Sequence, residues 1–522
     1  DMKDAANALR WASGKAAPRV VTGWGEIAAP LRERGFEVVA VKREGWRDAL
    51  KAADVALLPP EWPAAPEEVE RMAAFIKQGG GFVSGVPGWG WQSLNGAKSL
   101  VDDFPGNRLL APAGLVWADG TLDRTAEGGF DAARPSGLLH AGTALARLAT
   151  ARKEDLAQAG DSISRAARAL PAADALFLPK LRELRGKAGP LVPSSDKPLK
   201  TDRPLERALL AFEIDGIRRL KPAEVKAHPA AASFPGAVPA DAPRVTTRVK
   251  VDLAVPGWHS TGLYAAPGEV ITIQSPAPKL QVRIGCHADR LWHLDTWRRV
   301  PEITMRRPLA EGTTELASPF GGLIYLEIPN GASGAAEVEI RKAVEAPLFV
   351  LGETTPERWK EIRQRPAPWA ELATRKVILT LPSKVVRELE GVEEILRFWD
   401  RMMDLVAELA AIPAVRPRPE RYVPDVQISA GYMHSGYPIM THLDVEKTLV
   451  DVAKLKTDGW GFWHEMGHNH QAGDWTFEGT GEVTNNLFSV YVGEKLCGQA
   501  EGHDGVKAER RLTARDAEVV WL

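Results

Sequence analysis

Cysteine is scarce in this chain. Only Cys286 and Cys497 occur among 522 residues, so the chain cannot carry a framework of disulfide bonds. We therefore expect both thiols to be free or buried. The same scarcity bears on chemistry, because no cysteine precedes residue 286 to serve as a nucleophile in the first half of the chain.

An excess of charge of either sign is also absent. The 66 basic and 68 acidic residues leave a formal net charge of −2, which argues against nucleic acid or an anionic membrane surface as a partner. No uninterrupted apolar run approaches the ~20 residues that span a membrane. The composition, 44% hydrophobic and 26% charged, is that of a globular protein, and the length is enough for three or four domains.

Residues 1–135 alternate between strand-like and helical runs. Short apolar runs at 18–23 and 36–42 read as buried strands, and the segments 26–35 and 66–80 read as helices that end at glycines. Strands separated by helices predict a parallel sheet with crossover helices. We therefore expect an α/β module here.

A glycine-rich turn, GVPGWGWQSLNG at 85–96, follows one of these strands. Ligands often bind at such turns in parallel sheets. The arrangement resembles the class I glutamine amidotransferase-like fold, which places its nucleophilic cysteine near this position. Because this chain has no cysteine there, that chemistry is absent, and we interpret the region as an accessory module.

Two segments without evident chemistry follow. Leucine and alanine recur at helical spacing in residues 136–244, which end in a Pro/Ala-rich stretch and predict a helical spacer with a linker. Alternating apolar and polar residues broken by Pro and Gly in residues 245–345 predict a β-sandwich. His287 and His293 lie too far apart in this segment for a metal pair, and we expect packing or surface roles for them.

Residues 346–522 are mixed in character. The segment 375–381 predicts a strand, and 383–412 predicts one long amphipathic helix with Ser383 as its N-cap. A further strand is predicted at 425–431. The whole chain is thus expected to be a multidomain α+β protein.

The strongest chemical signal is the sequence His-Glu-x-x-His in residues 464–468. Residues four apart lie on one face of a helix, so His464 and His468 can bind one zinc ion. Glu465 is placed to act as general base on a zinc-bound water, whose pKa zinc lowers to about 7. A helix with two solvated histidines is the alternative, and chance gives such a motif in about 0.03 of chains of this composition.

A third ligand is expected downstream of the motif. Glu482 opens a predicted helix, whereas Glu478 lies in a glycine-flanked loop, so we favour Glu482 and keep Glu478 as the alternative. Hydrogen bonds to the ligand imidazoles are candidate roles for His470, Asp474 and Asn485. We do not assign His434 or His442 as ligands.

Substrate contacts are predicted on both sides of the motif. The segment 425–431 resembles the edge strand with which zinc peptidases pair an extended substrate. The phenol of Tyr437 suits the stabilisation of a developing oxyanion, with a packing role as the alternative. Asn469 and Trp475 could bind a glycan by hydrogen bonding and stacking, or belong to the core.

The motif and its surroundings resemble the peptidase M60 (enhancin-like) family. The likeness is carried by HEMGHNHQ and EVTNNLFSVYV, by GYMHSGYPIM at 431–440, and by sandwich segments such as STGLYAAPGEVITI, so that it covers residues 245–522. The region GGGFVSGVPGWGW at 79–91 is similar to the module that precedes M60-like domains in the TRPM8 channel-associated factors.

This resemblance implies a zincin (gluzincin-like) domain at 346–522 and a secreted or surface zinc endopeptidase of O-glycosylated, mucin-like proteins. Two alternatives stay open: a non-catalytic binding or scaffold protein, and a zinc peptidase of unglycosylated peptides. The chain stops some 40 residues after Glu482. Since peptidases of this type continue with further helices, we expect either that the domain is short at its carboxyl end or that the sequence stops before the domain is complete.

Overall fold

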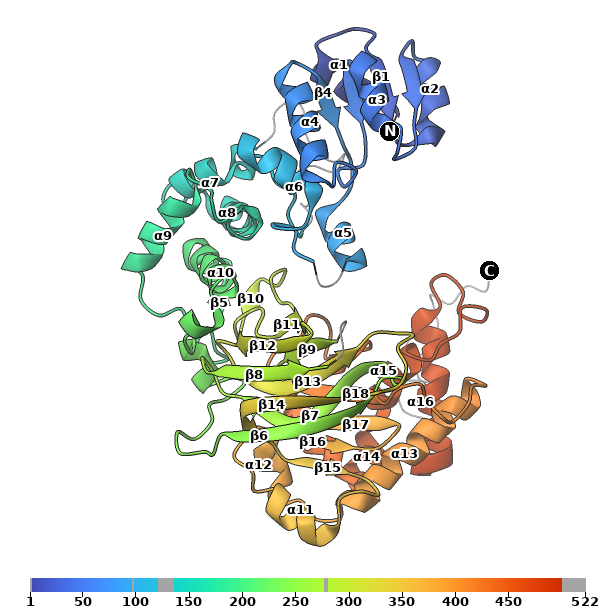
Figure 1. Cartoon of the computed structure of the whole chain (residues 1–522). Helices are drawn as coiled ribbons and strands as arrows, with labels where there is room; N and C mark the ends of the chain where they lie inside the picture. The colour runs from blue at the N-terminus through green and yellow to red at the C-terminus, as the bar shows by residue number, and fades with distance from the viewer. Residues whose placement is uncertain (1, 96–97, 121–135, 277–279, 500–522) are drawn as a thin grey trace. The chain divides into compact units, whose positions relative to one another are not determined.

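The computed structural model describes residues 2–95, 98–120, 136–276 and 280–499 (Figure 1). The chain divides into two compact units. One comprises residues 1–189 and 200–216, and the other comprises residues 190–199 and 217–522. The expectation about the end of the chain falls on residues 500–522, which lie outside the described residues.

The first unit contains a four-stranded parallel sheet. Its strands, in spatial order, are β2 (Glu37–Ala40), β1 (Arg19–Thr22), β3 (Val55–Leu57) and β4 (Gly81–Val83). Successive residues of a strand face opposite sides of a sheet. Val20 therefore packs in one core with helix α1 (Met2–Ser13), and Val21 packs in another with helix α4 (Pro66–Lys77). The predicted α/β region thus has helices on both faces of a parallel sheet, while its likeness to an amidotransferase stays a prediction.

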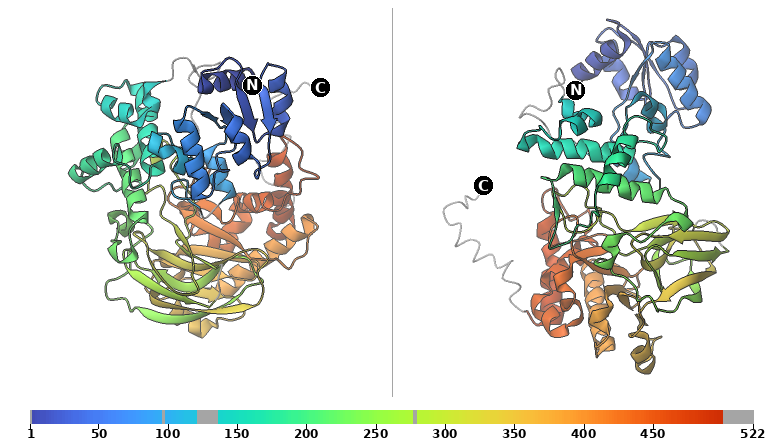
Figure 2. Two further views of the ribbon diagram at one scale, coloured as in Figure 1. Left: turned by 45° about the horizontal axis from the view of Figure 1, so that its top comes forward. Right: turned by 90° about the vertical axis from the view of Figure 1, so that its left-hand side faces the viewer.

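Helices dominate the rest of the first unit (Figure 2). They are α7 (Ala141–Arg147), α8 (Leu156–Ala169), α9 (Leu178–Lys187) and α10 (Pro204–Arg218). Helix α8 buries Ala159, Ile163 and Ala167, which recur every four residues and so share one face. An ion pair of 2.8 Å between Arg185 and Glu213 joins α9 to α10.

Antiparallel strands form one eight-stranded sheet in residues 245–345 of the second unit, which we call the sandwich region after the predicted β-sandwich. In chain order they are β6 (Val245–Asp252), β7 (Gly257–Ala265), β8 (Val270–Ser275), β9 (Gln281–Ile284), β11 (Met305–Pro308), β12 (Gly312–Ala317), β13 (Gly322–Ile328) and β14 (Ala335–Glu345). Strand β14 pairs with β6 and β8 along its first part and with β7 at Val344 and Glu345. It therefore joins two halves of the sheet, and Ile273, Val282 and Ile340 from both halves share one apolar core.

A six-stranded mixed sheet follows in the same unit (Figure 1). Its order is β15 (Leu348–Val350), β16 (Trp369–Ala373), β17 (Val377–Pro382), β18 (Glu420–Asp425), β20 (Ile439–His442) and β19 (Met433–His434). Helices α13 (Val392–Leu409), α15 (Trp460–His468) and α16 (Gly481–Cys497) share its core, to which they contribute Trp399, Phe462 and Phe488. Strand β19 ends the sheet on the side of α15.

The prediction of one long helix over 383–412 is wrong. Helix α12 (Ser383–Val386) is separate from α13, because Gly391 adopts a left-handed conformation with φ of +66° that ends helical continuity. Ser383 is the first residue of α12 rather than its N-cap, and its side chain makes no capping hydrogen bond to the helix. Its hydroxyl instead donates to the carbonyl of Ala367 at 2.6 Å.

The prediction of a strand over 425–431 is also wrong, since β18 ends at Asp425. The Asp425 carboxylate accepts a hydrogen bond from the backbone N–H of Gln427 at 3.1 Å, which turns the chain out of the sheet. The edge of the sheet next to β20 is formed by β19, and the opposite edge by β15.

Candidate metal centre

Helix α15 places the two motif histidines on one face. His464 and His468 are four residues apart, and their rings lie 4.8 Å apart between centroids. Glycines allow the helix to lie this close to its neighbours. A Cβ at Gly467 would come within 2.1 Å of the Asn485 amide oxygen on α16, and one at Gly459 within 2.2 Å of the Leu455 carbonyl.

Helix α16 brings a carboxylate to the same point. Oε2 of Glu482 lies 3.0 Å from Nε2 of His464 and 3.4 Å from Nε2 of His468. Ligand atoms of these three residues lie within 4.8 Å of one another and form the group in the described residues that could hold a metal ion. Two ligands of a tetrahedral zinc ion with bonds of about 2.0–2.1 Å are roughly 3.3 Å apart. The donor set and its spacing therefore fit zinc.

The other ring nitrogens of the two histidines are held by side chains. Asn486 Oδ1 lies 3.0 Å from Nδ1 of His464, and Gln471 Oε1 lies 3.0 Å from Nδ1 of His468. Because an amide oxygen only accepts hydrogen bonds, each Nδ1 carries the proton and each Nε2 is left free to bind a metal. Gln471 also donates to the carbonyl of Gly481 at 2.6 Å, which ties the end of α15 to the start of α16.

The residues that the sequence suggested for this supporting role lie elsewhere. His470 contacts the Met466 carbonyl and Arg416, and Asn485 is fully buried against α15 with no hydrogen bond to either amide atom. No hydrogen bond of Asp474 is seen in the described residues. The sequence could have identified Asn486 rather than Asn485 as the partner of His464, because Asn486 lies four residues after Glu482 and so on the same helical face.

Glu465 lies beside this group and is largely buried, with 9% of its surface exposed. Burial raises the pKa of its carboxyl group, and the nearby imidazoles of His464, His468 and His434 oppose that shift. Glu478 lies in the turn between α15 and α16, is exposed, and is not part of the His464–His468–Glu482 group.

The predicted substrate residues have partners within the protein. The Tyr437 hydroxyl accepts a hydrogen bond from the backbone of Trp258 at 3.4 Å, and the Arg418 guanidinium stacks on the Tyr437 ring. The Asn469 amide exchanges two 2.9 Å hydrogen bonds with the backbone of Gly436. Trp475 packs beside Phe488 at the edge of the core. Their roles toward substrate stay predictions.

None of the helices in the described part of the chain is both long and apolar enough to cross a membrane. A helix with paired histidines, followed by a helix that supplies a carboxylate, defines the class of HExxH metallopeptidase domains.

Comparison with known proteins identifies the family within this class. Residues 342–518 match the family model of peptidase M60, enhancin and enhancin-like proteins, and residues 240–341 match the N-terminal domain of M60-like peptidases. The chain belongs to the M60 peptidase family.

Curated relatives extend the likeness over most of the chain. It is 33% identical over 476 residues to a TRPM8 channel-associated factor homolog from Xenopus laevis, which covers 85% of this chain and 50% of the relative. It is 35% identical over 473 residues to TRPM8 channel-associated factor 2 from Bos taurus, covering 85% and 51%. The chain thus spans about half the length of the curated relatives that it matches.

Among solved structures, the chain is similar to the IMPa metallopeptidase from Pseudomonas aeruginosa in complex with an O-glycopeptide. The TM-score is 0.46 at 15% identity, and the match covers 99% of this chain and 69% of that chain.

Proposed function

We propose that the chain is a zinc-dependent endopeptidase that hydrolyses peptide bonds in O-glycosylated, mucin-like proteins at the cell surface or outside the cell. The observation that carries the peptidase part is the convergence of His464, His468 and Glu482, with the carboxylate of Glu465 beside them. The class of substrate and the location rest on the chain's membership of the M60 family.

Each of these residues has a defined task in this proposal. His464 and His468 bind zinc through Nε2, and Glu482 provides the third ligand. When bound, zinc supplies a Lewis acid that polarises the scissile carbonyl and makes a water molecule more acidic. Glu465 takes the proton from the attacking water and passes it to the leaving amine, for which a largely buried carboxylate with a raised pKa is suited.

The substrate backbone is proposed to lie along the exposed edge of β19. This strand ends the sheet on the side of α15, which we call the metal helix because it carries His464 and His468. Tyr437, Asn469 and Trp475 keep their proposed roles in oxyanion stabilisation and glycan binding. Of the three, Tyr437 accepts a hydrogen bond from the Trp258 backbone, which leaves its own O–H free to donate to a developing oxyanion.

A glycosylated mucin and the same mucin after enzymatic deglycosylation test this proposal as paired substrates, with Glu465→Gln as the inactive control. We expect cleavage of the glycosylated form alone, and full zinc content with no cleavage in Glu465→Gln. Equal cleavage of both forms would point to a peptidase of plain peptides. Cleavage by Glu465→Gln at the parent rate would remove Glu465 from the mechanism.

A second candidate function is a binding or scaffold role without catalysis. It is favoured by one observation, namely that the curated relatives are named as channel-associated factors. Elemental analysis of protein purified without added metal separates the two functions. A folded protein with near-zero zinc favours the scaffold, and one zinc ion per chain favours the peptidase.

A further inference from the structure

A loop of the sandwich region is tied to the segment that leads into the edge strand β19. Arg299 donates to the buried carboxylate of Asp425 through two nitrogens, at 2.9 and 2.8 Å. Two residues on, Gln427 accepts a hydrogen bond from the Arg298 backbone at 2.7 Å. Two residues further, the backbone N–H of Ser429 donates to Asp289 Oδ2 at 2.6 Å. Alternate residues from 425 to 429 are thus held by a loop that lies over 120 residues earlier in the chain.

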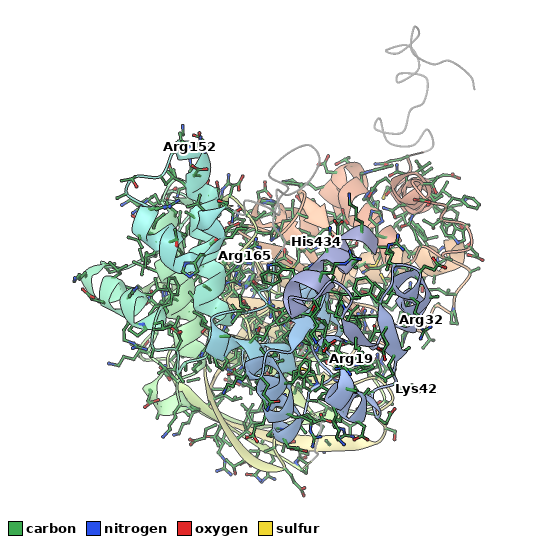
Figure 3. The ribbon with its side chains drawn as sticks, turned by 90° about the horizontal axis from the view of Figure 1, so that it is seen from above. Arg19, Arg32, Lys42, Arg152, Arg165 and His434 are labelled. Atoms are coloured by element: carbon green, nitrogen blue, oxygen red, sulfur yellow. The ribbon has the colours of Figure 1, made fainter. Side chains whose placement is uncertain are left out.

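The last of these ties is made by His434 within β19 itself (labelled in Figure 3). Its Nε2 lies 2.8 Å from Oδ2 of Asp289, and its Nδ1 lies 2.8 Å from the carbonyl oxygen of Ser435. A carbonyl oxygen and a carboxylate both accept hydrogen bonds. Only the positively charged imidazole has a proton on both nitrogens, so this geometry selects the charged form of His434.

The strand that carries His434 lies against the metal helix. The Met433 sulfur would be 3.0 Å from a Cβ at Gly461, so a glycine of α15 lets β19 approach closely. His434 is also near enough to Glu465 for the charge of each to shift the pKa of the other. His434 therefore lies where the edge of the sheet comes close to the helix that carries the metal ligands.

We propose that Asp289 and His434 form a charged pin by which the sandwich region positions β19, and with it the substrate backbone, over the metal helix. This proposal rests on the peptidase function proposed above. In this proposal the N-terminal M60-like domain (residues 240–341), which contains Asp289, is a structural part of the edge that binds substrate. Both are positioning residues, because their hydrogen-bonding atoms are used within the protein.

The pin has a defined dependence on pH. The hydrogen bond that His434 donates to Asp289 raises the pKa of His434, and the charge of Glu465 on α15 raises it further. The same pairing lowers the pKa of Asp289. Besides these two carboxylates, the carbonyl of Ser435 and the Ser429 hydroxyl, 3.2 Å from Nε2, contact the ring, and burial opposes the rise in its pKa. Since the pKa of His434 is raised on folding, the pin is fully present below about 6.5, the ordinary value for histidine, and is lost as pH rises through the folded value.

The kinetic test uses Asp289→Asn and His434→Gln in the full chain, with an O-glycosylated mucin peptide as substrate. A hydrogen bond to a charged group contributes ~1.5–3 kcal/mol, which corresponds to a roughly ten- to hundredfold fall in kcat/KM. We expect that fall in each variant at unchanged zinc content. The double variant should be no worse than either single one, because both remove the same interaction.

Asp444→Asn is the matched control. It removes the charge of the exposed carboxylate that accepts a 2.9 Å hydrogen bond from the Tyr432 hydroxyl, just before β19, and should leave kcat/KM within about twofold because exposed contacts contribute little. Parent kcat/KM in Asp289→Asn would overturn the proposal. So would an equal loss in Asp444→Asn, since that would show that any change near β19 has the same effect.

Nitrogen-15 NMR of the histidine rings tests the pin even if the parent chain hydrolyses nothing, in which case the proposed function fails but the pin does not. The His434 signals are identified by their loss in His434→Gln. We expect both ring nitrogens of His434 to be protonated at pH 6.5 and the midpoint of titration to fall in Asp289→Asn. Equal midpoints in the parent and Asp289→Asn would refute the pin.

Discussion

Oε2 of Glu482 lies 3.0 Å from Nε2 of His464, although 18 residues separate them in sequence. The intervening turn reverses the chain, so that the first turn of α16 faces the middle of α15. The contact depends on how the two helices pack. Three predictions about that packing can be tested, and a fourth concerns Glu302.

Glu482→Ala should empty the metal site at micromolar zinc, because it removes one of three protein ligands. Glu478→Ala should leave zinc affinity unchanged, since that carboxylate lies outside the group. The measurement is a zinc titration of both variants against a competing chelator. The reverse order of affinities would transfer the third ligand to Glu478.

Asn486→Ala should weaken zinc binding by about 10–100-fold, the usual effect of removing a side chain that orients a ligand histidine. The neighbouring variant Asn485→Ala is the control, because Asn485 is buried but makes no hydrogen bond to a ligand. We expect Asn485→Ala to alter stability and to leave the zinc affinity of the folded protein within a few-fold. A larger loss of affinity in Asn485→Ala than in Asn486→Ala would contradict this assignment.

Gly467→Ala should also lower zinc affinity, although position 467 carries no ligand. The added Cβ would lie 2.1 Å from the Asn485 amide oxygen, so α16 must move away from α15 and take Glu482 with it. Gly186→Ala in α9 is the matched control, since nothing lies within 4 Å of its Cβ and alanine favours a helix by about 1 kcal/mol. Thermal unfolding and zinc titration of both variants check the difference. An unchanged zinc affinity in Gly467→Ala would show that the two helices can separate without loss of the site.

The stability of the second unit should depend on pH through Glu302. Its carboxylate, 11% exposed, lies among Arg218, Arg290 and the indole N–H of Trp292. Burial opposes ionisation, but the two arginines and the indole lower its pKa to about 2. Because the pKa is lower in the folded state than the ordinary 4.5, the stabilisation is present above pH 4.5 and is lost as pH falls through about 2.

Glu302→Gln should therefore lower the free energy of unfolding at pH 7 by about 1.5–3 kcal/mol, and the difference from the parent should shrink below pH 4.5. Denaturant unfolding at a series of pH values measures it. An equal difference at pH 3 and pH 7 would mean that the charge of Glu302 contributes nothing.

Periodicity gave the helices and strands wherever local pattern and tertiary environment agree. The alternation of strands and helices before residue 95 corresponds to a parallel sheet, and the motif at 464–468 lies on a helix. The hydrophobic pattern predicted the wrong secondary structure at Gly391 and after Asp425. In both places one residue, a left-handed glycine or a carboxylate that bonds to the backbone, overrides a run of residues with the right hydrophobic spacing.

The sequence by itself determined the chemistry that this protein carries. Two histidines four residues apart with a glutamate between them lie on one helical face whatever surrounds the helix, because the period of the helix places them there. The sequence favoured Glu482 as a further member of the site, but whether it and other residues meet the histidines was decided by tertiary structure. Glu482, Asn486 and Gln471 meet the histidines through the packing of α16 on α15, and Asp289 reaches His434 from a separate region of the chain. Contacts between segments far apart in sequence depend on the folded arrangement of whole elements, and no local pattern encodes that arrangement.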